Sequence, residues 1–116
     1  MQVQVHTNHV VHDVEALVSH VEGVVTAALE RFNGQITRVE VHLSDVSHHK
    51  PGEHDKHCMM EARPAGHQPV AVSHEAGTWE EAIHRAAEKL EAALGKLHER
   101  LGHRKGNTSF GGDQTI

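Results

Sequence analysis

Alternating apolar and polar residues predict four short strands along the chain. The pattern is strictest over 35–46, and it recurs over 2–6, 56–63 and 68–74. Because successive side chains of a strand point to opposite faces, one set in each segment is expected to face a core. The residues expected to point inward are Val3, Val5, Thr37, Val39, Val41, Leu43, Cys58, Met60, Ala62, Val70 and Val72.

A helix is predicted between the first two strands. Apolar residues over 13–32 recur with the 3.6-residue period of one buried helix face. Asp13 is the expected N-cap, and Asn33-Gly34 is the expected stop. The regular spacing of the apolar residues favours a helix more strongly than the modest helix propensity of valine disfavours it.

A second helix is predicted after the last strand. Thr78 and Glu81 have the spacing of a capping box, in which the hydroxyl and the carboxylate satisfy backbone N–H groups at the helix start. An apolar stripe then continues to about Leu101, and Gly102 is the expected C-terminal cap.

The predicted element order is β-α-β-β-β-α, which indicates an α+β domain of two layers. Two strands joined through a helix are expected to pair in parallel, and the next two to add an antiparallel meander. The result is a four-stranded mixed sheet with both helices on one face. The open face is expected to carry Gln2, Gln4, Arg38, Glu40, His42, His57, Met59, Glu61, Arg63, Ala71 and Ser73.

The length of 116 residues predicts one domain, over 1–102, followed by a disordered polar and Gly-rich tail over 103–116. No apolar stretch reaches the roughly 18–20 residues that span a bilayer, so no membrane partner is expected. A single cysteine, Cys58, and a start without signal-peptide features favour the cytoplasm. Cys58 is expected to be a buried thiol and not a nucleophile.

The charge of the chain is acidic and uneven. A formal net charge of -5 argues by itself against binding phosphates. The 14 histidines would bring the net charge to roughly +5 if about three quarters were protonated near pH 6. Residues 1–30 contain four acids and no Lys or Arg, whereas Lys96, Arg100, Arg104 and Lys105 cluster near the C-terminus. A nucleic-acid contact is therefore expected at that end.

Several segments resemble the ribosome hibernation-promoting factor and RaiA family, formerly called sigma-54 modulation proteins. The segments are Arg38-Val39-Glu40-Val41-His42-Leu43-Ser44-Asp45, Asp55-Lys56-His57-Cys58, Glu61-Ala62-Arg63-Pro64-Ala65-Gly66-His67-Gln68-Pro69, and Ala82 with Ala86-Ala87-Glu88-Lys89-Leu90. The resemblance covers about residues 1–101 in matching order, in the short form without a C-terminal dimerisation domain.

The resemblance implies a fold similar to a double-stranded-RNA-binding domain and a role as a translation inhibitor. Such proteins dock on the small ribosomal subunit, in the mRNA and tRNA channel of idle ribosomes, and hold rRNA by its backbone. The partners implied are the small subunit and its rRNA, with no DNA, no cofactor and no catalysis. The RNA contacts implied are Lys89, Lys96, Arg100, Arg104 and Lys105, followed by Arg38, Arg63 and Lys56.

Two alternatives remain open from the sequence. The loop histidines His48, His49 and His54 could bind Zn²⁺, Ni²⁺ or Cu²⁺, which would make the chain a His-rich metal-binding or stress-response module that does not bind ribosomes. Alternatively, the domain could dimerise through its open sheet face or its last strand. The oligomeric state is not determined by these patterns.

Overall fold

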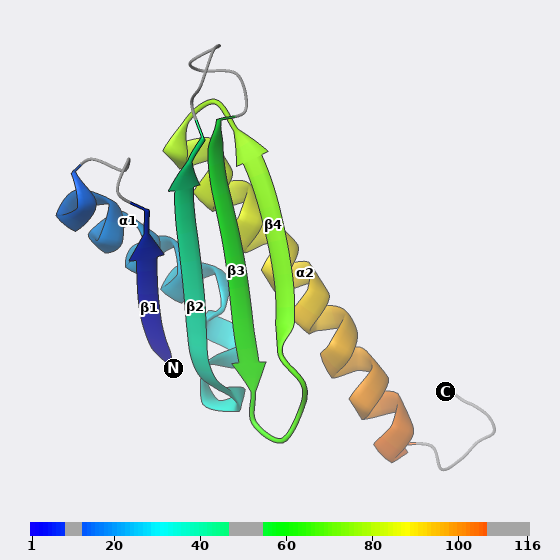
Figure 1. Ribbon diagram of the computed structural model, residues 1–116. Coiled ribbons are helices and arrows are strands. Elements are labelled where there is room, and N and C mark those ends of the chain that lie inside the picture. The colour runs from blue at the N-terminus through cyan, green and yellow to red at the C-terminus, as the bar shows by residue number, and fades with distance from the viewer. Residues whose placement is uncertain (9–12, 47–54, 107–116) are drawn as a thin grey trace.

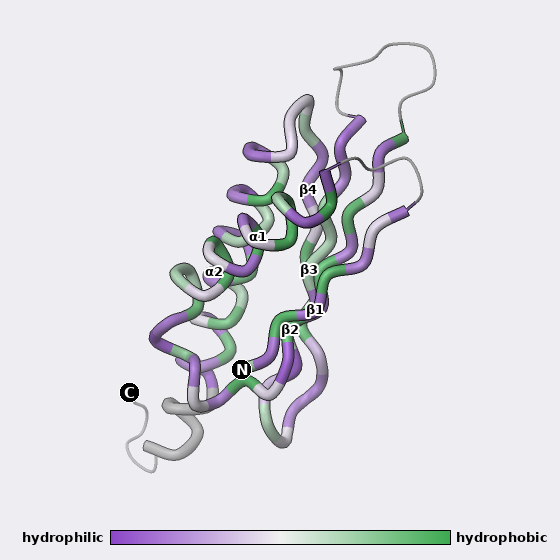
Figure 2. Tube along the Cα trace, turned by 90° about the vertical axis from the view of Figure 1, so that its left-hand side faces the viewer, coloured by the Kyte–Doolittle hydropathy of each residue, from purple (hydrophilic) through white to green (hydrophobic). Residues whose placement is uncertain are grey.

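The computed structural model has two layers, a mixed sheet and two long helices that cover one of its faces (Figures 1 and 2). It describes residues 1–8, 13–46 and 55–106, with side chains described as far as Arg100. The elements are β1 (Gln2–Thr7), α1 (Val14–Ala28), the 3₁₀ helix η1 (Glu30–Gln35), β2 (Ile36–Asp45), β3 (Lys56–Pro64), β4 (Val70–Ala76) and α2 (Trp79–Gly106). This order confirms the predicted α+β class.

The strands lie side by side in chain order, β1-β2-β3-β4. β1 and β2 are parallel, as expected for strands joined through a helix, and β2, β3 and β4 form an antiparallel meander. The view along the sheet shows α1 and α2 on the same side of it (Figure 2). No helix in the described part of the chain is long and apolar enough to cross a membrane.

The core lies between the sheet and the helices. Six of the seven residues predicted to point inward from the two central strands are at most 1% exposed: Val39, Val41, Leu43, Cys58, Met60 and Ala62. Those of the outer strands, Val3, Val5, Val70 and Val72, are partly buried and pack against the same core. The helices, with the C-cap residue Leu29 of α1, complete it with Val21, Val25, Leu29, Ala82, Ile83, Ala86, Ala87, Leu90 and Leu94.

The inward orientation predicted for Thr37 is wrong. The register between β2 and β3 shifts between Ile36 and Arg38, so Ile36 is buried and Thr37 is exposed. Such a bulge places two residues of one strand opposite one of its neighbour and turns the extra side chain away. The Thr37 hydroxyl instead donates a 3.0 Å hydrogen bond to the carbonyl of Arg63.

The predicted first helix exists, but it ends before Asn33-Gly34. The backbone leaves the α conformation at Leu29, with φ -107° and ψ 17°, and continues as η1. There the N–H of Phe32 donates to the carbonyl of Leu29 at 2.9 Å, an i to i−3 bond. Leu29 and Phe32 are both buried. The predicted end of the helix is wrong because two apolar residues three positions apart, here Leu29 and Phe32, fit a 3₁₀ turn as well as an α-helix.

Asp13 occupies the predicted N-cap position without using its side chain. Its backbone is left-handed, with φ 53° and ψ 48°, and the side chain makes no capping hydrogen bond. The Asp13 carbonyl accepts the N–H of Leu17 at 3.1 Å, which is the first bond of the helix. Aspartate adopts this conformation more readily than most residues.

The second helix begins as predicted and ends later than predicted. The N–H of Glu81 donates to the Thr78 hydroxyl at 3.2 Å, so Thr78 caps the helix. The helix then continues through Gly102 to Gly106, and residues 107–116 of the expected tail lie outside the described residues. A glycine ends a helix when it adopts positive φ. In the described part of the chain, Gly66 is the glycine that does so, with φ 78°.

Replacing a core side chain of α2 is expected to destabilise the fold. Leu90 is fully buried, and Leu90→Ala should lower the free energy of unfolding by about 2–5 kcal/mol because it removes packing and leaves a cavity. Urea denaturation followed by circular dichroism measures the change. The exposed Lys96→Ala control should stay within about 0.5 kcal/mol of wild type. Equal stability of the two variants would contradict the described packing.

The Cys58 thiol is expected to be unreactive in the native protein. Burial raises the pKa of Cys58 to about 12, and the residue is 1% exposed. Because the thiolate is the reacting species, labelling by an aromatic disulfide reagent near pH 8 should be slow until denaturant opens the core. The urea-unfolded chain is the control for full reactivity. Rapid labelling of the native protein would show that Cys58 is accessible.

Candidate nucleic-acid interface

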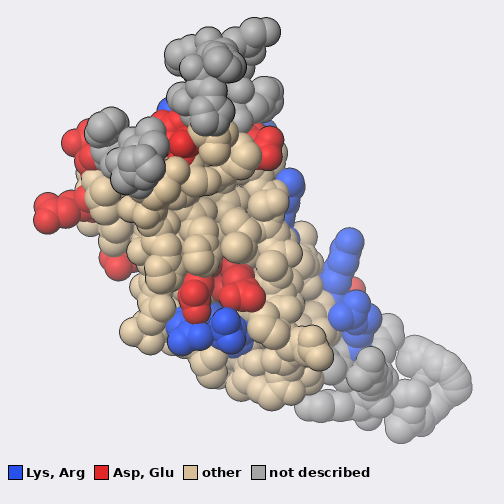
Figure 3. All heavy atoms as spheres, in the orientation of Figure 1, with Lys and Arg blue, Asp and Glu red and all other residues tan. Residues whose placement is uncertain are grey.

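Three of the predicted RNA contacts lie along one face of α2. Lys89, Lys96 and Arg100 are all exposed, and a period of 3.6 residues places them within about 40° of one another around the helix axis. We call these three residues the α2 cation stripe. Figure 3 shows Lys and Arg atoms along the side of the molecule that α2 occupies. The structure therefore brings together residues that the sequence spreads over three helical turns.

Lys89 joins the stripe to the edge of the sheet. Its Nζ donates a 2.8 Å hydrogen bond to the carbonyl of Ser73 in β4. β4 is the last strand of the sheet, so this bond also covers part of an open strand edge. A lysine ammonium has three donors, which leaves two for other acceptors. The stripe thus borders the β4 edge.

Arg85 extends the same face and was missed by the sequence interpretation. It lies one helical turn before Lys89. The spacing of four residues between them could have indicated that both lie on the same helix face. Its Nη1 lies 3.3 Å from Oε1 of Glu88, and both side chains are exposed. A solvated ion pair of this kind contributes little, so Arg85 can exchange Glu88 for another anion at low cost.

The extension of α2 beyond Gly102 carries Arg104 and Lys105 on the same helix. Position 104 follows Arg100 by about one turn and so lies on the side of the stripe, whereas position 105 is turned about 100° further. The side chains of both residues lie outside the described residues, and their RNA contacts stay predictions.

Arg38 and Arg63 lie together on the open face of the sheet, where acidic neighbours pair with them. Arg38 Nη2 is 3.0 Å from Glu40 Oε2, and Arg63 Nε is 3.8 Å from the same oxygen. Arg63 Nη2 also lies 3.2 Å from Glu61 Oε1. The positive charges of the sheet face are therefore largely balanced within the face. The α2 cation stripe offers phosphate more net charge.

Lys56 lies at one end of the sheet, in an ion-pair network between β2 and β3. Its Nζ is 2.8 Å from Asp45 Oδ2 and 3.5 Å from Asp55 Oδ2, and it lies 5.8 Å from the Trp79 ring centroid. The hydrogen bond to Asp45, reinforced by the charges of both carboxylates, raises the pKa of Lys56. Trp79 is partly buried and packs against the core.

The α1 side of the molecule has the opposite charge. Within α1 the charged residues are Glu15 and Glu22, and its last turn contains no basic residue. Acidic atoms accordingly gather on the α1 side in Figure 3. Arg31, just after α1, turns toward α2 and lies 3.7 Å from Glu91. A Cβ on Gly95 would lie 3.0 Å from the Arg31 side chain, so the glycine leaves space for this arginine.

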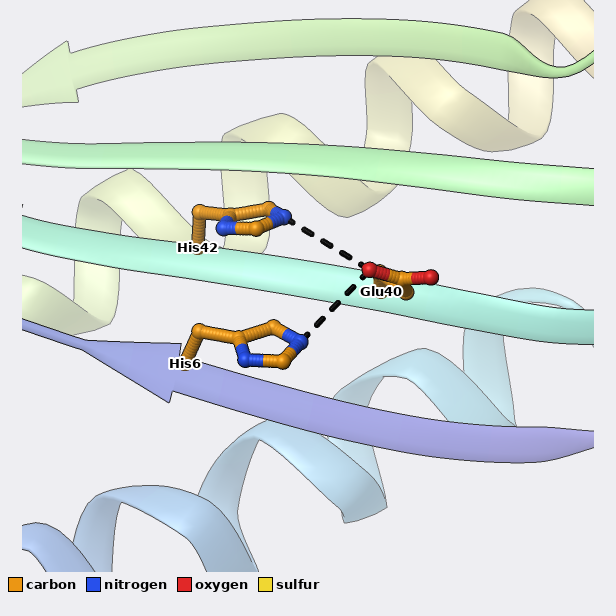
Figure 4. A group of neighbouring side chains, drawn as sticks. All are labelled: His6, Glu40 and His42. Carbon is orange, nitrogen blue, oxygen red and sulfur yellow. Dashed lines mark ion pairs between the residues drawn. The ribbon is translucent and has the colours of Figure 1, made fainter.

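Two histidines and a glutamate gather on the outer sheet face (Figure 4). His6 and His42 are direct partners in the parallel β1–β2 pair, and Glu40 precedes His42 by two residues on the same face. The sequence interpretation placed His42 and Glu40 on this face but did not connect them with His6. The pairing of β1 with β2 brings His6 beside Glu40 and His42, and the sequence does not specify this pairing. The loop histidines His48, His49 and His54 lie outside the described residues.

Comparison with known proteins identifies the family. The family model described as Sigma 54 modulation protein / S30EA ribosomal protein matches residues 3–102, and the chain belongs to this family. The match confirms the resemblance seen in the sequence. The family consists of ribosome-associated modulation proteins, which are not known as enzymes.

Two solved structures share the fold. The Protein Y N-terminal domain of Thermus thermophilus matches with a TM-score of 0.67 and 22% identity, over 84% of this chain and 99% of that one. A ribosomal subunit interface protein from Coxiella burnetii matches with a TM-score of 0.63 and 14% identity, over 85% and 99% of the two chains. A search of curated proteins found no match.

Replacing Lys56 is expected to destabilise the domain in a pH-dependent way. Lys56→Gln should lower the free energy of unfolding by about 1–3 kcal/mol near pH 7, because it removes the donor shared by two largely buried carboxylates. Since the folded pKa is raised, the contribution of the charge is complete below the unfolded value of about 10.4 and is lost as pH rises through the folded value.

Urea denaturation near pH 7 and above pH 11 measures this effect. The difference between wild type and Lys56→Gln should shrink at the higher pH, and Asp45→Asn combined with Lys56→Gln should recover part of the loss. An equal difference at both pH values would show that the lysine charge is not the source of the stability.

Proposed function

We propose that this protein binds the small ribosomal subunit through the α2 cation stripe and silences idle ribosomes by occupying the mRNA and tRNA channel. The observation that carries the proposal is the alignment of Lys89, Lys96 and Arg100 on one exposed helix face. Family membership supports the ribosome as the partner. The fold likeness to a ribosomal subunit interface protein is consistent with it.

Electrostatics favour α2 as the binding face. Affinity for the phosphate backbone comes mainly from Lys and Arg that replace condensed counterions. On the sheet face, Arg38 and Arg63 already pair with Glu40 and Glu61, so binding phosphate there would require exchange of partners. The exposed cations of α2 need less rearrangement. The sheet-face arginines are therefore proposed as secondary contacts.

The proposed contact reads the shape of the RNA and not its sequence. Lysine and arginine on a rigid helix suit a row of backbone phosphates, and contacts of this kind fix the orientation of a protein without reading bases. Structured rRNA presents phosphates and 2′-hydroxyls across a shallow minor groove. Occupation of the channel would then exclude mRNA and tRNA sterically, without catalysis, in the cytoplasm.

Co-sedimentation with small ribosomal subunits on sucrose cushions tests the proposal. Wild-type protein should pellet with subunits at about 50 mM salt and less at about 200 mM. Lys96→Ala/Arg100→Ala should bind more weakly and depend less steeply on salt. The slope of log affinity against log salt should fall by about 0.7–0.9 for each phosphate that the variant no longer neutralises. Arg104→Ala/Lys105→Ala tests the end of the helix in the same way.

Arg38→Gln/Arg63→Gln is the matched control, because it removes the same two charges from the sheet face. It should reduce binding less than the α2 variant. A larger loss in this control would move the contact to the sheet face. Folded wild-type protein that fails to co-sediment at either salt concentration would refute ribosome binding.

A further inference from the structure

The cluster of His6, Glu40 and His42 has the donor set and the backbone support of a metal site (Figure 4). Its residues come from two hydrogen-bonded strands, and all project from the outer face of the sheet. The imidazole rings of His6 and His42 stack, with centroids 4.7 Å apart and planes 18° apart. The backbone thus holds both rings in register beside one carboxylate.

The donor atoms converge on one carboxylate oxygen. Nε2 of His6 lies 3.5 Å from Glu40 Oε1, and Nε2 of His42 lies 3.9 Å from the same atom. All three donors lie within 4.8 Å of one another. Zinc at its usual 2.0–2.1 Å from nitrogen and oxygen would separate tetrahedral ligands by about 3.3 Å. The two stacked rings must also rotate so that both Nε2 lone pairs converge on one ion, and His6 and His42 are about half exposed and have space for this rotation.

Glu40 is oriented for one-oxygen coordination. Its Oε2 faces Arg38 at 3.0 Å and Arg63 at 3.8 Å, which leaves Oε1 toward the histidines. Ion-paired partners around a ligand help to orient it and tune its affinity for metal. The charge of Arg63 is countered by Glu61 at 3.2 Å, which reduces the repulsion that a bound cation would meet.

We propose that His6, Glu40 and His42 bind a divalent transition metal ion of the zinc class, with water in the remaining position. Two imidazoles and a carboxylate suit Zn²⁺, Ni²⁺ or Cu²⁺, whereas Mg²⁺ and Ca²⁺ prefer oxygen ligands alone. A His–Glu ion-pair network without metal would explain each contact singly. The register between β1 and β2 nevertheless brings two imidazole nitrogens to one carboxylate oxygen, and this convergence of donors is what a metal site needs. The site is separate from the α2 cation stripe and does not depend on ribosome binding.

Calorimetric titration of the full chain with Zn²⁺ near pH 7.5 tests the proposal. The His6→Gln/His42→Gln variant should bind one zinc equivalent fewer than wild type. Loss of an outer-shell partner weakens metal affinity roughly 10–100-fold, and loss of a direct ligand should weaken it at least as much. His48→Gln/His49→Gln/His54→Gln is the matched control for other zinc-binding histidines and should keep that equivalent. Excess Mg²⁺ should not displace the metal. Circular dichroism verifies that each variant is folded.

Two results would overturn the proposal: wild type that binds no zinc, or the His6→Gln/His42→Gln variant retaining every equivalent that wild type binds. If the variant fails to fold, a measurement on the wild-type protein alone still tests the proposal. Substoichiometric Ni²⁺ should broaden the amide NMR signals of residues 6, 40 and 42 before those of the 47–54 loop. Broadening that starts in the loop would place the metal there and reject the sheet site.

Discussion

The alternation of side chains across the sheet is the constraint on which the rest of the structure depends. Each of the two central strands puts alternate residues into the core, so burial of Val39, Val41, Met60 and their neighbours assigns the intervening residues to the open face. A shift of one residue would exchange the two sets. The helices on the inner side and the charged network on the outer side are both consequences of this register.

The same constraint determines where positive charge is available. On the open face, the register places Arg38 opposite Arg63 and Glu40 opposite Glu61, and these four side chains neutralise one another. At the end of β2 and β3, the charge of Lys56 is used to hold Asp45 and Asp55. The position of the α2 cation stripe is not set by this register, because its residues lie on an exposed helix face beside the edge strand.

Much of the fold could be predicted from the sequence because its main signals are periodic. The strands, the two helices and the Thr78 cap follow from period and spacing, and the structure confirms them. The departures occur where a local pattern fits two geometries. Leu29 and Phe32 suit a 3₁₀ turn as well as an α-helix, and Gly102 is tolerated inside α2 at a cost of about 1 kcal/mol relative to alanine.

The candidate sites differ in how far sequence reasoning could reach them. The α2 cation stripe was predictable because helix spacing alone brings its residues together. The bulge that exposes Thr37 and the contact between His6 and Glu40 depend on pairing between strands. The residue pattern of a single strand does not specify which residues of a neighbouring strand it will pair with.

A net charge of -5 is compatible with the proposed RNA contact because the charge is distributed unevenly. The exposed lysines and arginines of α2 lie at one side of the molecule, and the acids of α1 lie at the other (Figure 3). In the field of a phosphate backbone, the α2 side is attracted and the α1 side is repelled, so incorrect orientations are disfavoured while the correct one is favoured. The acidic side would therefore contribute specificity. It would also lower the overall affinity for RNA.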